Sequence, residues 1–291
     1  MGVTHRVLYV GIGGTGVHIG KELEVALRRD LCGPDGKALI RKGGAFSKLS
    51  PYQLPDYIQS LYFDFDDDAE QILQKGTDLN TKLIEKNATV VKSIHASGAT
   101  SYRVAAEMLR ADKDTSSMTK NWLPEKDNEP QVAPLSDGAG QYPTVGRAAL
   151  YLALNRSGNE IEREIDQAIR RLVLAGGMLQ AMKNESDKPK VLCYVGFSVA
   201  GGTGTGIFYD VIHLLEKRLN TILEGIEVNI FPLTLLPSAF IENWKPNNVK
   251  AGKSNAAIAL KDLAQLVEHL QKDDQPEDFK IHYPQPFGVT K

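Results

Sequence analysis

The stretch SVAGGTGTGIFYD, residues 198–210, joins two apolar segments of different character. The preceding segment, VLCYVGF (191–197), is short and apolar, which is typical of a buried strand. The following segment, IFYDVIHLLEKRL (207–219), has apolar residues at helical spacing. Each glycine between them costs backbone entropy on folding, so four glycines at this junction indicate a backbone that another group must approach closely.

A second glycine-rich loop occupies the same setting near the N-terminus. RVLYV (6–10) predicts a strand, GIGGTG (11–16) follows it, and VHIGKELEVALRRD (17–30) predicts a helix. Free N–H groups and the positive dipole end at a helix N-terminus attract anions. Neither loop contains the lysine of a Walker A loop, so we expect N–H groups, hydroxyls and a metal ion to offset phosphate charge, unless both loops are only structural turns. The predicted phosphate-binding residues are Gly11, Gly13, Gly14, Thr15, Gly16, Gly201, Gly202, Thr203, Gly204, Thr205 and Gly206.

Two further segments add candidates to this site. In DGAGQYPTVGR (137–147), Gly138, Ala139 and Gly140 are predicted to lie against a terminal phosphate, and Arg147 either contacts that phosphate or lies on a helix surface. An acidic run from Asp64 to Asp68 follows the predicted strand SLYFDF (60–65). We expect Asp66 and Asp68 to hold Mg²⁺ through water, the alternative being a solvated acidic turn.

The order of elements predicts an α/β fold. Apolar strands alternate with helices, which favours a parallel, Rossmann-like sheet with helices on both faces. We expect a nucleotide-binding domain over 1–271, with insertions near 31–58 and 111–135, and a tail over 272–291. A further strand is predicted at 226–236, a helix at 255–271, and a long helical region from about 145 to 183 with breaks near 157–158 and 176–177.

Composition excludes several other classes. The net charge of −2 does not favour nucleic-acid binding, and no apolar run is long enough to span a membrane. The two cysteines, Cys32 and Cys193, have no metal-binding spacing, and no signal peptide is visible, so we expect a cytoplasmic protein. The six histidines form no ligand-spaced pair, and no G-x-S-x-G motif supports a hydrolase triad.

Taken in order, the three loops GIGGTG, GAGQYPTVGR and AGGTGTG (200–206) resemble the nucleotide-binding loops of the tubulin/FtsZ superfamily, with Ala200 replacing the first glycine of the last. The resemblance covers most of residues 5–271 and implies a bacterial, filament-forming relative that binds GTP or GDP with Mg²⁺. It also implies that Glu242 contacts the ribose and Asn255 the guanine base, although Asn255 also fits a plain helix N-cap.

The chain departs from that superfamily after the helix at 255–271. No long central helix, acidic hydrolysis loop or C-terminal domain is recognisable there, so we expect GTP binding with slow or absent hydrolysis, and we assign no catalytic residue. Two alternatives remain open: a Rossmann-type enzyme that binds NAD or FAD, and a scaffold module without a nucleotide. The first expects a carboxylate about 20 residues after the glycines, and neither explains GGTGTG.

Overall fold

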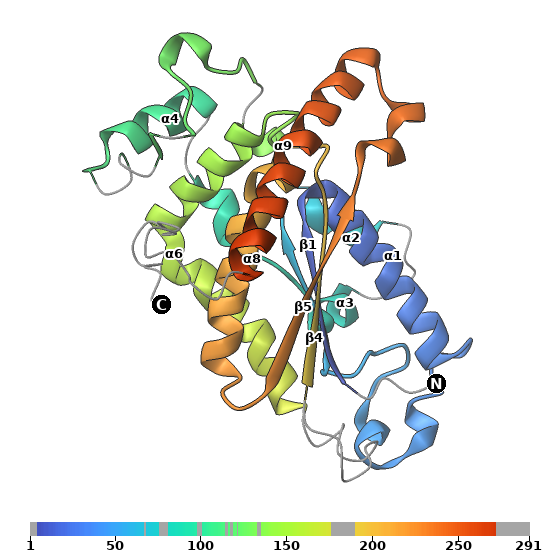
Figure 1. The fold of residues 1–291 in the computed structure, drawn as a ribbon. Coiled ribbons are helices and arrows are strands. Elements are labelled where there is room, and N and C mark those ends of the chain that lie inside the picture. The colour runs from blue at the N-terminus through green and yellow to red at the C-terminus, as the bar shows by residue number, and fades with distance from the viewer. Residues whose placement is uncertain are drawn as a thin grey trace.

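A computed structural model describes residues 5–66, 68–75, 81–97, 101–113, 116, 119–120, 122–132, 135–175 and 190–271. Within these residues, five strands form one parallel sheet in the order β3-β2-β1-β4-β5 (Figure 1). The predicted α/β class with a parallel sheet is therefore confirmed. The strands are β1 (Arg6–Ile12), β2 (Ile58–Phe63), β3 (Ala88–Val90), β4 (Lys190–Ser198) and β5 (Glu227–Leu235).

Helices pack on both faces of the sheet, and the alternation of side chains along β1 shows why. Leu8 and Val10 point into the larger apolar core, which β1 shares with α6 and α8. Tyr9 points the other way, into a smaller cluster with Val17 of α1. The described helices are α1 (Gly13–Cys32), α2 (Ala69–Gln74), α3 (Thr81–Asn87), α4 (Tyr102–Ala111), α6 (Pro143–Leu174), α8 (Gly202–Ile222) and α9 (Pro246–Gln271).

The helices agree with the sequence prediction at one position and differ from it at another. Helix α6 begins at Pro143 and contains a non-helical residue at Ser157, which confirms the break expected near 157–158. The break expected near 176–177 and the tail 272–291 lie outside the described residues. Helix α9 begins at Pro246, nine residues before the predicted start, because proline fits the first turn of a helix, where no N–H donor is needed.

The described residues of the segments 31–58 and 111–135, which the sequence predicts as insertions, pack against neighbouring elements. Residues 31–58 contain two 3₁₀ turns, and Phe46, Leu54 and Tyr57 bury an apolar cluster of their own there. In the second insertion, Arg110 Nη1 of α4 donates to Glu129 Oε1 at 2.5 Å and fastens the segment to the helix that precedes it. Packing between elements, which local composition does not show, therefore orders these polar stretches.

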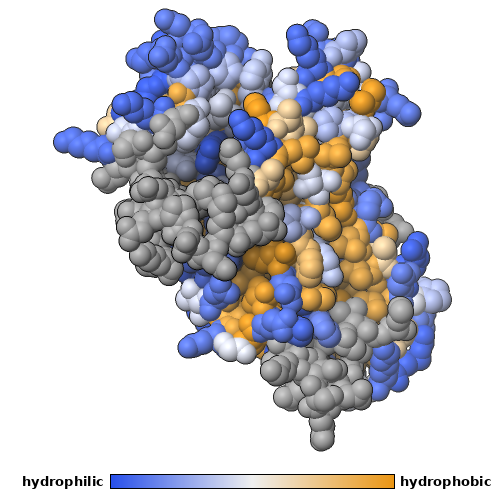
Figure 2. Space-filling view, viewed as in Figure 1, coloured by the Kyte–Doolittle hydropathy of each residue, from blue (hydrophilic) through white to orange (hydrophobic). Residues whose placement is uncertain are grey.

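β5 is one of the two edge strands of the described sheet, the other being β3. Its Phe231 and Leu233 are 42% and 46% exposed, and the space-filling view shows apolar surface over this strand (Figure 2). Among the described helices, none has both the length and the apolar character needed to cross a membrane.

Candidate functional site

The site lies at the carboxyl ends of β1 and β4. These two strands are neighbours in the sheet, but β1 leads into α1 on one face and β4 leads into α8 on the other. The strand order therefore reverses between them, and such a switch point leaves a crevice where ligands of parallel α/β sheets bind. The two glycine-rich loops that the sequence singled out are the connections that leave this point.

The structure brings the three predicted loops into contact. A Cβ built on Gly13 would lie 3.2 Å from Gly204 N, so the loops after β1 and β4 touch. The N–H of Gly202 donates to Gly140 O at 2.8 Å, which joins the loop after β4 to the loop before α6. The predicted juxtaposition of loops that are far apart in the sequence is thus present in the fold.

Three helices begin at this point without a capping side chain. The N-cap residues of α1, α6 and α8 are Ile12, Tyr142 and Gly201, and none makes a side-chain cap hydrogen bond. None of the three helices carries an acidic residue in its first turn. No capping side chain therefore satisfies their first N–H groups, and no carboxylate of their own first turns offsets their positive dipole ends, an arrangement that favours anion binding.

Apart from Gly13, which touches Thr203 and Gly204, the predicted site glycines fall into two groups. An added Cβ at one group would meet nothing within 4 Å, or only a side-chain oxygen at 3.6 Å: Gly14, Gly138, Gly140 and Gly201. At the other group it would lie 2.2–2.7 Å from a backbone carbonyl oxygen: Gly11, Gly16, Gly202, Gly204 and Gly206. The first group borders open space, whereas the second is required for the elements to pack against one another.

This division corrects one reason given for the glycines of GGTGTG. The sequence suggested that they all serve the close approach of phosphate. The Cα of Gly204 instead packs against the end of β4, with Ser198 O at 2.4 Å from a built Cβ. Within this loop, Gly201 is the glycine that borders open space which a phosphate could approach. The hydroxyl Oγ1 of Thr205 is buried and has no hydrogen-bond partner among the described residues, so it is free to donate to a ligand.

Among the described residues of the acidic run 64–68, Asp64 is the one that lies beside the glycine-rich loop after β1. It follows β2 directly, is 3% exposed, and places Oδ2 3.6 Å from a Cβ built on Gly14. The predicted metal residues are farther into solvent: Asp66 accepts a hydrogen bond from Asp68 N in a turn, and Asp68 is exposed. No group of three or more potential metal ligands among His, Cys, Asp and Glu gathers within the described residues. Position in the acidic run pointed to this segment but could not single out Asp64.

The burial of Asp64 predicts a pH-dependent stability. Burial raises the pKa of Asp64 to about 7 from the ordinary value of 3.8. The folded protein then holds a proton that the unfolded chain has released, so this residue lowers stability as pH rises through that window. Without nucleotide or metal, Asp64→Asn is expected to raise the free energy of unfolding by on the order of 2 kcal/mol at about pH 8, and little at about pH 4. Urea unfolding at the two pH values measures this, and a pH-independent difference would contradict it.

Arg147 does not reach toward the three loops. Its guanidinium faces Asp210 of α8, with Nη2 3.4 Å from Oδ1, and lies over the rings of Trp122 and Tyr151. The phosphate contact predicted for Arg147 therefore lacks support, and so does the alternative of a plain helix-surface arginine. Asp210 itself escaped notice, although a single acidic residue within the apolar run IFYDVIHLL was a usable signal.

Asn255 links two of the loops from α9. Its Nδ2 donates to Gln141 O at 2.9 Å and to Ala200 O at 3.3 Å, and the residue is 7% exposed. Because α9 begins at Pro246, Asn255 lies inside the helix and is not an N-cap. Glu242, the predicted ribose contact, lies exposed in the 3₁₀ turn Ile241–Asn243 between β5 and α9.

We expect Asn255→Asp to destabilise the protein and to lower its affinity for any ligand that the loops hold. The new carboxylate oxygen would face the carbonyls of Gln141 and Ala200, where a donor is needed, at a cost of about 1–3 kcal/mol. Thermal unfolding should show a loss of several degrees. The matched control is Asn248→Asp on the exposed first turn of the same helix, which should leave the midpoint unchanged. Equal shifts in both variants would argue against the link.

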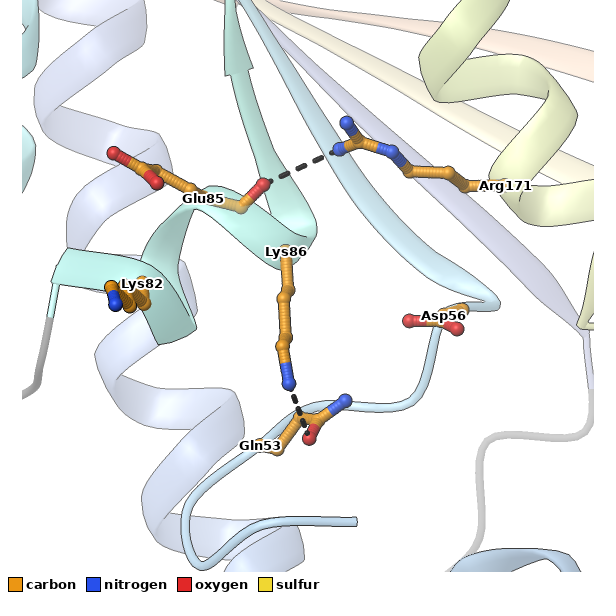
Figure 3. A pocket seen from close by; sticks show the side chains of 6 residues that line it. All are labelled: Gln53, Asp56, Lys82, Glu85, Lys86 and Arg171. Atoms are coloured by element: carbon orange, nitrogen blue, oxygen red, sulfur yellow. Dashed lines mark hydrogen bonds between the residues drawn. The ribbon is translucent and has the colours of Figure 1, made fainter. Parts of the chain in front are cut away.

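A separate pocket of about 500 Å³ lies at the opposite end of the sheet, where residues 53–56 lead into β2 and α3 leads into β3 (Figure 3). Lys86 Nζ donates there to Gln53 Oε1 at 3.2 Å, and Arg171 Nη1 donates to Glu85 O at 3.3 Å. None of the site residues predicted from the sequence lines this pocket. The residues that do are Gln53, Asp56, Lys82, Glu85, Lys86 and Arg171.

Comparison with known families agrees with the fold and the loops. A family model described as "Tubulin like" matches residues 8–290, which is nearly the whole chain. The chain therefore belongs to this tubulin-like family, as the three loops predicted. A search of curated proteins finds no match for it.

Proposed function

We propose that the protein binds a guanine nucleotide, GTP or GDP, at the switch point between β1 and β4. The observation that carries the proposal is the meeting of three uncapped helix N-termini beside open glycines. A polyphosphate is the ligand whose charge is spread over several oxygens that can accept hydrogen bonds from more than one such terminus. Membership of the tubulin-like family supports the view that this polyphosphate is part of a nucleotide.

The phosphates would lie between the first turns of α1 and α8. N–H groups of residues 13–16 and 203–205 would donate to phosphate oxygens, as would Thr205 Oγ1, while Gly202 N–H keeps its bond to Gly140 O. The open space at Gly201 on one side and at Gly138 and Gly140 on the other would admit the terminal phosphate. Arg147 is left out of this set because Asp210 already engages its guanidinium.

A magnesium ion fits the carboxylate that faces these loops. Asp64, beside Gly14, would hold Mg²⁺ through water, with Asp66 at the outer side of the hydration shell. The ion would supply charge neutralisation for the phosphates, which the absence of lysine from both loops leaves to a metal. Its binding would favour the ionised carboxylate of Asp64, whose burial otherwise favours the protonated form.

The base would lie on the side of the site that α9 closes. Asn255 and Glu242 are the residues that the resemblance assigns to guanine and ribose, and both belong to the segment between β5 and the middle of α9. We propose slow or absent hydrolysis by this chain alone, because no acidic residue is recognised in the role of the loop that completes hydrolysis in the superfamily. For assembly, we propose that a longer form of the protein self-associates into filaments in the cytoplasm, and that this chain alone forms filaments weakly or not at all.

Equilibrium titration of the purified chain with GTP, GDP, ATP and NAD, each with and without Mg²⁺, tests this function. We expect GTP and GDP to bind at least tenfold more tightly than ATP, and Mg²⁺ to increase the affinity for GTP. The rate of phosphate release from GTP should stay near the rate measured without protein. Equal affinity for ATP would contradict the guanine assignment, and rapid phosphate release would contradict the slow hydrolysis.

One observation favours a second candidate, a dinucleotide-binding enzyme. Asp64 lies directly after β2, which is where Rossmann-type domains place the carboxylate that binds the adenine ribose, although it lies much farther along the chain than the roughly 20 residues expected after the glycines. In that reading GGTGTG and the loop before α6 have no ligand to hold. Binding of NAD in preference to GTP in the same titration would establish it.

A further inference from the structure

An ion pair between a buried aspartate and a partly exposed arginine joins α8 to α6 just behind the candidate site. Arg147 Nη2 lies 3.4 Å from Asp210 Oδ1, and Arg147 Nε lies 3.4 Å from Asp210 Oδ2. The Asp210 side chain is 1% exposed and that of Arg147 is 31% exposed. Burial is the main influence on the pKa of Asp210 and raises it, while the Arg147 guanidinium opposes that rise. Removing only Arg147 would leave the buried carboxylate of Asp210 without its partner, which is expected to destabilise the protein strongly.

The pair stands next to a crossing of the two helices at two glycines. A Cβ built on Gly146 would lie 2.9 Å from Gly202 O, and one built on Gly206 would lie 2.2 Å from Pro143 O. The N-terminal parts of α6 and α8 therefore approach each other through backbone at these two glycines. Arg147 sits one residue after Gly146, and Asp210 sits one turn after Gly206, so the ion pair fastens the helices immediately behind the crossing.

Two aromatic rings, Trp122 of the second insertion and Tyr151 of α6, lie against the Arg147 side of the pair. The Arg147 guanidinium lies 5.3 Å from the ring centroid of Trp122 and 5.7 Å from that of Tyr151. The two rings meet edge to face at 5.2 Å. Trp122 belongs to the insertion near 111–135, so this insertion adds a cation–π contact to the Arg147 side of the pair.

We propose that Arg147, Asp210 and Trp122 are positioning residues, which hold the N-termini of α6 and α8 in the register that the phosphates require. The proposal rests on the proposed function for the identity of the ligand, but not for the register of the loops. The insertion thereby acquires a role: it stabilises the link between the loop before α6 and the loop after β4. The ion pair would thereby preserve the hydrogen bond between these loops, in which Gly202 N donates to Gly140 O at 2.8 Å.

The same two helices offer a matched control pair far from the loops. Arg218 of α8 donates to Asp166 Oδ1 of α6 at 2.8 Å, and it also lies 3.5 Å from Glu162 Oε2. These residues lie well past the first turns of both helices. Breaking this pair weakens the packing of α6 on α8 without touching the crossing at Gly146 and Gly206.

The test compares Arg147→Met/Asp210→Leu with Arg218→Met/Asp166→Leu/Glu162→Gln, in which the third substitution removes the other carboxylate that faces Arg218. Apolar replacement of both partners avoids leaving a buried charge alone. Hydrogen exchange of the ligand-free proteins is measured for the segments 137–142 and 198–203, and the affinity for GTP is measured by titration. In the first variant we expect faster exchange in both segments and about tenfold or greater loss of affinity, whereas the control should change neither, even where urea unfolding shows an equal loss of stability.

Each outcome decides between the claims. Unchanged exchange in the first variant, or equal changes in both, would overturn the positioning role. Faster exchange confined to the first variant, with wild-type protein that binds no GTP, would uphold the positioning role and reject the proposed nucleotide. If the first variant fails to fold, Arg147→Lys and Trp122→Leu serve instead: loss of the planar guanidinium or of the Trp122 ring should speed the same exchange, and no change in either would overturn the proposal.

Discussion

Gly201→Val is expected to weaken GTP binding by about 100-fold or more while leaving the fold intact. Gly201 is the N-cap of α8 and has φ −90° and ψ 176°, a backbone conformation that valine adopts readily. A Cβ built there meets nothing within 4 Å. The valine side chain would therefore enter the space proposed for phosphate without displacing any protein atom. A 100-fold loss corresponds to about 2.7 kcal/mol of binding free energy.

Titration of GTP into wild-type and variant protein, with circular dichroism as the check on folding, measures this effect. The control is Gly225→Asn, where the side chain also enters open space, but between α8 and β5 at the amino end of that strand. Gly225 has φ 76°, which asparagine tolerates better than other side chains. The control should bind GTP as the wild type does, and unaltered binding by Gly201→Val would show that the phosphates lie elsewhere.

Gly204→Val, three residues further along the same loop, is expected to prevent stable folding. Its Cβ would lie 2.4 Å from Ser198 O and 3.3 Å from Ser198 N, so the first turn of α8 would have to move off the end of β4. Overpacking against backbone, with a β-branched side chain, is expected to cost more than about 4 kcal/mol, at the exceptional end of single substitutions.

Urea unfolding and the yield of folded protein measure the consequence of Gly204→Val. Gly14→Ala provides a comparison in the other loop, because its Cβ would meet only Asp64 Oδ2, at the ordinary distance of 3.6 Å. We expect Gly14→Ala to fold normally. A stably folded Gly204→Val protein that merely fails to bind GTP would support the simpler view that every glycine of GGTGTG lines the phosphate.

Much of this architecture could be predicted because its signals are local. The apolar strand followed by a glycine loop and an amphipathic helix occurs at both 6–30 and 191–219, and this order predicts a parallel sheet. The three loops also predicted the tubulin-like family, which the family match at 8–290 confirms. The site lies where the strand order reverses, a consequence of topology that follows once the strands are paired.

The roles of single residues could not be predicted because they depend on neighbours that are distant in the sequence. Gly201 and Gly204 are alike in composition, yet one borders open space and the other packs on Ser198. Arg147 engages Asp210, which is 63 residues away, and Asn255 joins two loops that precede it by more than 50 residues. Burial selects Asp64 from the acidic run, and no property of the run itself indicates which carboxylate is buried.

Hydrogen exchange with and without GDP and Mg²⁺ tests the location of the phosphates most directly, since the proposed contacts are backbone amides. We expect slower exchange in residues 11–16 and 201–206, the first turns of α1 and α8, with little change in residues 53–56 and 82–86 around the pocket at the other end of the sheet. Bound GDP that protects the pocket segments and leaves both glycine loops unchanged would contradict the proposed site.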